Sequence, residues 1–146
     1  MVTRFFAYVN TSSTPGGRFP GYRDRPKKFL YDYLKAANIA AKDDPALINT
    51  MRREFETMLV FVARTFPHGF QKSDANHAVP RVRFEAIAVG SALALRENSG
   101  LEARPDEIER QMQDAGFDQV VVSDGANVRA KLEGRIDLVK NLLVGQ

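Results

Sequence analysis

The chain is 146 residues long, the size of one ordinary domain, and this length suffices to bury a single hydrophobic core. Hydrophobic residues make up 44% and charged residues 27% of it, globular values that argue against a wholly disordered chain. The absence of cysteine excludes disulfides, a thiolate nucleophile and cysteine-based zinc sites, and it fits a reducing compartment.

The sequence shows no signal for export or membrane insertion. The apolar cluster in the opening residues, MVTRFFAYVN, is too short for a secretory signal, and no run of about 18 apolar residues occurs. We therefore expect a soluble cytoplasmic protein without a membrane partner.

Residues 3–9, TRFFAYV, are rich in aromatic side chains and fit either a helix or a strand. The following residues 11–21, TSSTPGGRFPG, combine Ser, Thr, Pro and Gly, which favour turns. We predict a flexible basic loop over 11–25.

Two helices are predicted next. Pro26 suits the first position of the earlier helix, which runs to about residue 41. Asp44 followed by Pro45 is a strong start signal for the later helix, because the carboxylate can cap free backbone N–H groups. That helix extends to Phe66 and ends because Pro67 cannot continue it.

Residues 80–97, PRVRFEAIAVGSALALRE, form the predicted centre of the fold. Apolar residues cover nearly all faces of this helix, which is typical of a helix buried within a bundle. Gly90 lies among small residues that allow neighbouring helices to approach closely, at a cost of about 1 kcal/mol in helix propensity.

Two more helices are predicted after the central one. The first begins at Pro105 and ends at Gly116, and we interpret residues 117–122 as coil. The last helix is predicted to be capped by Ser123 or Asp124 and to combine an apolar inner face with basic residues that stay in water. The inner face is Val128, Leu132, Ile136, Val139 and Leu143, and the exposed residues are Arg129, Lys131, Arg135 and Lys140.

Together these patterns predict an all-α fold. Helix follows helix through short links, so we expect a single helical domain over residues 1–146. In this domain five to six helices form a compact bundle around the apolar helix at about 80–97.

Basic side chains are concentrated in one segment. The chain carries 21 Lys and Arg against 18 Asp and Glu, but residues 18–28, RFPGYRDRPKK, hold five basic side chains against Asp24 alone. Cations next to aromatic rings are what nucleic-acid surfaces use to contact phosphates and to stack on bases. The candidate contacts are Arg18, Arg23, Arg25, Lys27 and Lys28. An acidic partner protein would suit them equally, and a solvated loop without a ligand is the alternative.

Glu85 begins the otherwise apolar surface of the central helix, where a buried carboxylate is costly unless it is paired. Arg81 precedes it by one helical turn and lies on the same face. We predict a structural ion pair between the two. A general acid or base role is the alternative, but no second carboxylate has suitable spacing.

No residue pattern indicates catalysis or metal binding. The only histidines, His68 and His77, lie in a loop with Asp74 between them, without HExxH spacing and without a cysteine partner. Neither a nucleophile elbow nor a phosphate-binding glycine loop is present. We therefore assign no catalytic residue, no metal and no cofactor.

Several stretches of the sequence, taken in order, resemble a known family. They are FFAYVN, KKFLYDYLK, FPHGFQK, PRVRFEAIAVGSALALRE and SDGANVRAKLEGRIDLVKNLL, which extend over nearly the whole chain. They resemble the C-terminal helical region of the ParB/sulfiredoxin-like proteins, the family of the GmrSD-type restriction endonuclease N-terminal domain. In that family the nuclease or nucleotide-hydrolysing chemistry is attributed to an N-terminal domain with a motif of the DGQQR kind, which this chain lacks.

The resemblance implies a non-catalytic helical accessory or interaction domain, related to restriction systems and separate from the catalytic domain. A ParB-like catalytic domain or protein is the implied partner. We expect the surface that meets this partner, or a second copy in a homo-oligomer, to include Phe5, Phe6 and Tyr8. A nucleic-acid-binding module acting through residues 18–28 is the second hypothesis, and a stand-alone enzyme ranks last.

Overall fold

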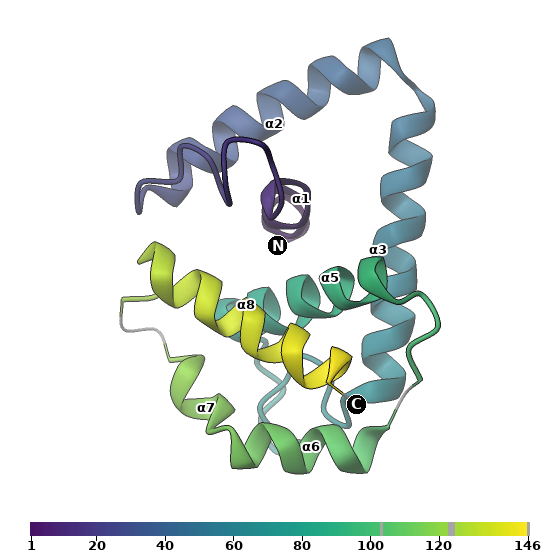
Figure 1. Ribbon diagram of the computed structural model, residues 1–146, viewed down its shortest axis with the longest axis vertical. Helices are drawn as coiled ribbons and strands as arrows, with labels where there is room; N and C mark the ends of the chain where they lie inside the picture. Colours follow the sequence, from purple (N-terminus) through teal and green to yellow (C-terminus); the bar gives the residue numbers. More distant parts are fainter. Residues whose placement is uncertain (103, 123–124, 146) are drawn as a thin grey trace.

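The computed structural model of the protein describes residues 1–102, 104–122 and 125–145, and this part of the chain is helical without a β-strand (Figure 1). The all-α fold predicted from the sequence is confirmed. No helix in the described ranges is long and apolar enough to cross a membrane.

The helices follow the predicted order. The chain begins with α1 (Val2–Thr11), continues through a loop to α2 (Pro26–Asp43), and turns sharply into α3 (Ala46–Thr65). After a second loop, α4 (Arg81–Phe84), the π-helical turn η1 (Glu85–Val89) and α5 (Gly90–Glu97) follow one another without a break. The chain ends with α6 (Pro105–Asp114), the short helix α7 (Phe117–Val120) and α8 (Arg129–Val144).

Local start signals place the helices correctly. Pro26 and Pro105 open α2 and α6 as predicted. Asp44 Oδ1 accepts a hydrogen bond from the backbone N–H of Ala46 at 3.0 Å, as expected for a capping acid before α3.

The interpretation of residues 117–122 as coil is wrong for Phe117–Val120, which forms α7, and is confirmed for the last two residues, 121 and 122. Gly116 has φ 62° and starts this turn, and the buried Phe117 anchors it to the core. The proposed caps Ser123 and Asp124 lie outside the described residues. The last helix begins at Arg129, so Val128 precedes it and is 42% exposed instead of forming part of the inner face.

The continuous helix made by α4, η1 and α5 is the centre of the molecule, as predicted. Every residue from Val82 to Ala92 is buried, and α8, α3 and α1 contact this helix from different sides (Figure 1). A Cβ added at Gly90 would lie 2.8 Å from Cβ of Val139 and 2.9 Å from the carbonyl oxygen of Ile136. The close contact between the central helix and α8 therefore requires glycine at this position.

The π turn at Glu85–Val89 was not expected from the sequence pattern, which indicates an ordinary α-helix. A π turn places an extra residue in one turn, so the helix faces before and after it are offset. Such turns occur often at functional sites, and here the turn begins at the buried residue Glu85.

The loop between α1 and α2 packs on the core through two aromatic side chains, although most of its other residues are exposed. The flexibility expected over 11–25 stays a prediction. The side chains of Phe19 and Tyr22 are 0% and 1% exposed. Their rings join those of Tyr8 and Phe29, with centroid distances of 5.4 Å for Tyr8–Phe19 and for Tyr22–Phe29. Burial of these rings attaches the second half of the loop to the core.

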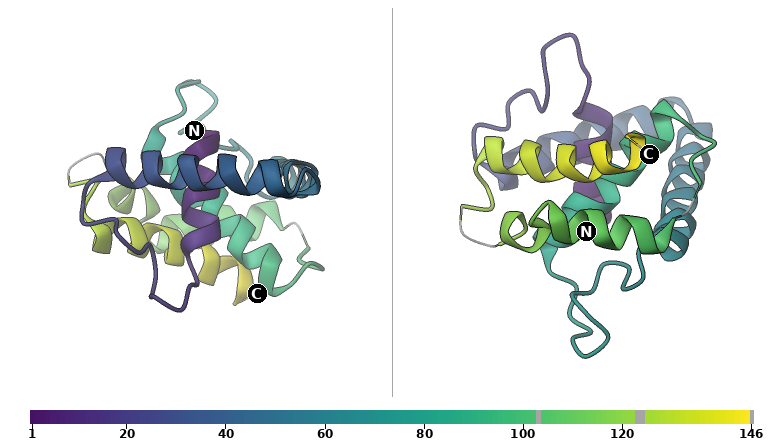
Figure 2. Two further views of the ribbon diagram at one scale, coloured as in Figure 1. Left: turned by 90° about the horizontal axis from the view of Figure 1, so that it is seen from above. Right: turned by 60° about the horizontal axis from the view of Figure 1, so that its bottom comes forward.

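The far half of α2 and the first half of α3 extend away from this core. Residues 30–57 are all described, and none of their side chains is fully buried. Figure 1 shows the two helices meeting at the upper right, and Figure 2 shows α2 crossing over α1 before it reaches this corner.

Candidate nucleic-acid interface

The loop that leads into α2 determines where its basic side chains lie. Phe19, Arg23 and Asp24 have φ values of 48°, 43° and 54°, in the left-handed region that residues with a side chain rarely adopt. Each such residue costs on the order of 1 kcal/mol, which the burial of the Phe19 and Tyr22 rings offsets. The strained turn brings Arg25 to the beginning of α2, where its backbone N–H donates to the carbonyl of Tyr22 at 2.8 Å.

The five predicted contact residues do not form one group. Arg18 lies apart: its Nη1 donates to both carboxylate oxygens of Asp137 at 2.7 Å, and its guanidinium lies over the Phe19 ring. Arg23 is exposed on the strained turn. The structure brings together Arg25, Lys27 and Lys28, which line one cleft at the start of α2.

This cleft, which we call the basic cleft, has a volume of about 570 Å³. Cations from the beginnings of three helices line it, together with a proline and an amide side chain. The lining residues are Arg4, Arg25, Pro26, Lys27, Lys28, Arg81 and Asn127. Within the described part of the chain, no acidic residue lines the cleft, so its walls carry positive charge.

Hydrogen bonds hold several of these side chains in place. Arg81 Nη1 donates to Oδ1 of Asn127 at 3.0 Å, which connects α4 to the segment before α8. Lys28 Nζ lies 2.5 Å from Oδ2 of Asp32, one turn further along α2. This pair is exposed at both ends and is easily exchanged for a ligand.

Glu85 is buried next to the basic cleft and contacts Arg4 and Arg81 of its lining. Two arginines, Arg4 and Arg135, bind it more closely than Arg81, the partner predicted from the sequence. Its Oε1 accepts from Arg4 Nη1 at 2.8 Å and its Oε2 from Arg135 Nη2 at 2.6 Å. Arg81 Nη1 is 3.9 Å from Oε1, at the limit of an ion pair. The structural role predicted for Glu85 is thus shared by three arginines, of which Arg81 is the most distant.

Arg135 contradicts the prediction that it lies in water, since its side chain is 1% exposed. Besides Glu85, it donates through Nη2 to the carbonyl of Ala126 at 2.9 Å. The sequence contained a signal for this position, because Arg135 is three residues after Leu132 and four before Val139, on the buried stripe of α8. A buried Glu85 also requires a buried cation.

The ionisation of a nearby tyrosine is coupled to this cluster. Arg4 Nη1 donates to Tyr8 Oη at 3.1 Å, so Tyr8, Arg4 and Glu85 are in contact. Burial, and to a lesser extent the negative charge of Glu85, raises the pKa of Tyr8 well above its usual range. Tyr8 therefore stays a neutral hydrogen-bonding group in the folded protein.

Two predicted surface roles are wrong because the side chains are inside the fold. Phe5, Phe6 and Tyr8 are 0%, 7% and 0% exposed, so they cannot form an interface with a partner or a second copy. Phe19 and Tyr22 are equally inaccessible and cannot stack on bases. The sequence shows that these residues are aromatic, but it does not show which elements cover them.

The two histidines have different surroundings in the structure. His68 Nδ1 lies 2.9 Å from Oδ1 of Asp74, whereas His77 is exposed further along the loop. In the described ranges, no group of three or more His, Cys, Asp or Glu side chains is placed to hold a metal ion.

Comparisons with models of protein families, with curated proteins and with solved structures gave no match for the chain. The resemblance to the GmrSD-type family, and the accessory role that it implies, therefore stay predictions.

Proposed function

We propose that the chain is a helical nucleic-acid-binding module whose basic cleft contacts backbone phosphates. One observation carries this proposal: cations that are far apart in the sequence line a single cleft, namely Arg4, Arg25, Lys27, Lys28 and Arg81. A concentration of like charge raises the local positive potential, which attracts polyanions.

The chemistry of the cleft favours phosphate contacts over base contacts. Arginine and lysine bind phosphate oxygens through charge-assisted hydrogen bonds, and such contacts position a nucleic acid without reading its sequence. No aromatic residue of the described part of the chain lines the cleft, so stacking on bases is not expected there. We therefore expect binding that depends weakly on sequence and strongly on salt.

The test is a fluorescence anisotropy titration of a labelled oligonucleotide, single-stranded and duplex, at several salt concentrations. With about four phosphate contacts, the logarithm of the affinity should fall against the logarithm of salt with a slope of about −3 to −4. The combined variant Arg25→Gln, Lys27→Gln and Lys28→Gln should lower the affinity at least tenfold and make the slope shallower by about 2 to 3.

A matched control separates the cleft from net charge. Lys35→Gln, Lys42→Gln and Arg53→Gln remove the same number of positive charges from exposed positions on α2 and α3, and none of them lines the cleft. This variant should bind nearly as well as the unmodified protein. An equal loss in both triple variants, or no binding at low salt, contradicts the proposal. Competition by polyglutamate at equal affinity would indicate an acidic protein partner instead.

A further inference from the structure

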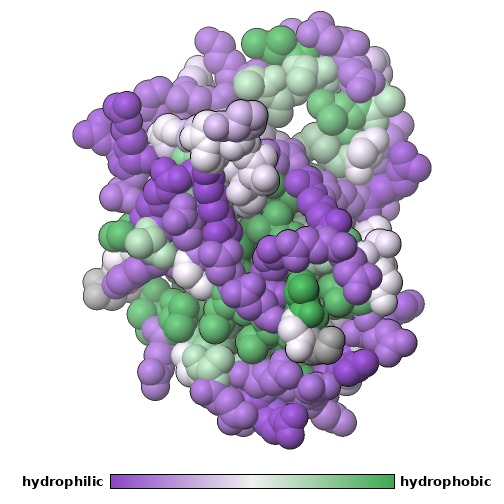
Figure 3. Space-filling view, in the orientation of Figure 1, coloured by the Kyte–Doolittle hydropathy of each residue, from purple (hydrophilic) through white to green (hydrophobic). Residues whose placement is uncertain are grey.

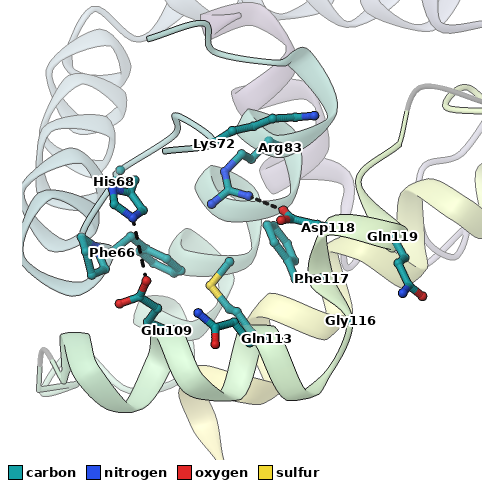
Figure 4. A pocket seen from close by; sticks show the side chains of 13 residues that line it. Phe66, His68, Lys72, Arg83, Glu109, Gln113, Gly116, Phe117, Asp118 and Gln119 are labelled. Carbon is teal, nitrogen blue, oxygen red and sulfur yellow. Dashed lines mark hydrogen bonds and ion pairs between the residues drawn. The ribbon is translucent and has the colours of Figure 1, made fainter. Parts of the chain in front are cut away.

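A second cavity, of about 340 Å³, lies between the loop after α3 and the helices α6 and α7 (Figure 4). Arg81 and Arg83 are two residues apart in α4 but line different cavities, because Arg81 faces the basic cleft and Arg83 faces this one. We call it the Arg83 cavity. Its volume lies within the range of small-molecule sites, about 300–1,000 Å³.

Arg83 has the features of a ligand-binding guanidinium. The residue is 7% exposed, and Figure 4 shows its guanidinium directed into the space between His68 and Phe117. Nη1 donates to Oδ1 of Asp118 at 2.9 Å, while the buried Nε has no acceptor within the described residues. Burial lowers the pKa of Arg83, and the nearby Asp118 opposes this change.

The ion pair with Asp118 does not account for the burial of Arg83. The Asp118 side chain is 79% exposed, so water weakens its interaction with the guanidinium. A buried arginine requires a charged or hydrogen-bonding partner for its remaining donors. The cavity leaves room for such a partner beside Arg83.

The rest of the cavity combines an apolar floor with a polar mouth. Phe66, Met112 and Phe117 line it and are 3%, 7% and 2% exposed. The Phe117 ring also lies against the guanidinium, 5.0 Å from its central carbon. His68 and Lys72 also line the cavity. Figure 4 shows His68 directed toward Glu109, whose Oε1 lies 3.8 Å from His68 Nε2, and the Lys72 amine pointing away from the cavity.

A guanidinium presents a planar fork of donors that matches a carboxylate or a phosphate. The apolar floor suits a flat hydrocarbon ring next to that head group. We propose that the Arg83 cavity binds a small molecule that carries an oxyanion on an aromatic body, with Arg83 on the oxyanion and the ring on the floor. This site is independent of the nucleic-acid proposal, because none of its lining residues belongs to the basic cleft.

The test uses NMR titrations of the isotope-labelled protein with benzoate, phenyl phosphate and inorganic phosphate. Benzoate or phenyl phosphate should bind with a Kd on the order of 1 mM, as expected for molecules of this size, and should shift the amide signals of residues 66–69 and 116–119. The tighter of the two identifies the head group. Inorganic phosphate, which leaves the floor empty, should bind several-fold more weakly than phenyl phosphate, and equal binding contradicts the role of the ring.

Arg83→Gln should weaken binding of the tighter compound at least tenfold, because a charge-assisted fork is replaced by a neutral amide. Arg110→Gln is the matched control, since Arg110 is exposed on α6 and does not line the cavity. Equal affinity of Arg83→Gln and the unmodified protein would overturn the proposal.

Asp118→Asn tests whether the ligand contacts Arg83, and it does so even if Arg83→Gln does not fold. Because Asp118 is exposed, its replacement should leave the fold intact. It removes the carboxylate that competes for the guanidinium, so the oxyanion should bind about threefold to tenfold more tightly. Asp114→Asn, an exposed neighbour outside the cavity, should change the affinity little. Unchanged affinity in Asp118→Asn would show that the ligand does not meet Arg83.

Discussion

Glu85 and Arg135 have side chains that are each 1% exposed, and their carboxylate and guanidinium lie 2.6 Å apart. Burying such a pair costs desolvation energy that its attraction barely repays, but removing one partner leaves a buried charge without compensation. We expect Glu85→Gln to lower the free energy of unfolding by about 3–5 kcal/mol in urea denaturation followed by circular dichroism.

The loss in free energy of unfolding should differ between substitutions of Glu85 and of Arg135. Arg135→Met should cost less than Glu85→Gln, because Arg4 still pairs with the carboxylate at 2.8 Å. Arg81→Gln is the control and should cost less than about 1 kcal/mol, since its guanidinium is 3.9 Å from Glu85 and partly exposed. A cost for Arg81→Gln as large as that for Glu85→Gln would contradict this account of the cluster.

Tyr8 should make the protein sensitive to alkali. Its pKa, ordinarily 10.0, is raised in the fold by burial and by Glu85, so the unfolded chain loses this proton first as the pH rises. The stability that neutral Tyr8 contributes is complete below about pH 10 and falls above it by about 1.4 kcal/mol per pH unit.

Tyr8→Phe removes this titrating group and isolates its effect. Between about pH 9 and pH 11, the free energy of unfolding of the unmodified protein should fall more steeply than that of Tyr8→Phe, since the two proteins differ only in this ionisable group. Equal slopes would show that Tyr8 ionises as easily in the folded protein as in the unfolded chain.

At the scale of the elements, the contact between the central helix and α8 depends on Gly90. Alanine at this position would gain about 1 kcal/mol in helix propensity but would force Val139 and the backbone of Ile136 away. Because overpacking of a rigid helix contact outweighs that gain, Gly90→Ala should lower the stability by about 1–3 kcal/mol.

Gly134 provides the matched control on the partner helix. It is an exposed glycine in α8, and a Cβ there would meet nothing within 4 Å. Gly134→Ala should therefore raise the stability by about 0.5–1 kcal/mol, the opposite sign to Gly90→Ala in the same thermal or urea experiment. The same sign for both variants would contradict the close approach at Gly90.

Local sequence signals were sufficient for most helix boundaries and insufficient for the segments between them. Proline fixes the backbone φ at the first turn of a helix, and the Asp44 carboxylate accepts a hydrogen bond from a free backbone N–H. The starts of α2, α3 and α6 could therefore be predicted. The π turn and α7 depend on packing against other elements, and neither has a local signal of comparable strength.

At the scale of the whole molecule, the corner of α2 and α3 extends from the core and has no fully buried side chain over residues 30–57. Val2, Leu34 and Ile48 are among the residues that line a hollow of about 380 Å³ between α1, α2 and α3, and each is 44–50% exposed. Figure 3 shows hydrophobic surface around this hollow at the upper right. The expected homo-oligomer stays a prediction.

Amide hydrogen exchange should show that the corner of α2 and α3 opens more easily than the central helix and α8. The backbone amides of residues 34–50 should exchange much faster than those of α5 and of residues 132–143 in α8, because few buried contacts must break to open the corner. Measurement at two protein concentrations excludes protection by self-association. Protection at the corner equal to that of α5 would contradict the prediction.

The sequence alone determined the all-α class, the central position of residues 80–97, a stretch of small residues around Gly90 that allows close helix packing, and a paired Glu85. The helices follow from apolar periodicity and turn residues, which are local properties of the sequence. The pairing of Glu85 follows from the cost of burying a charge, which holds whatever surrounds the carboxylate. The tertiary structure decided which arginines bind Glu85, that the aromatic residues near the start are covered, and that Arg4, Arg25 and Arg81 share a cleft. Those outcomes depend on which helices meet, and that is set by the packing of the whole chain rather than by neighbours in sequence.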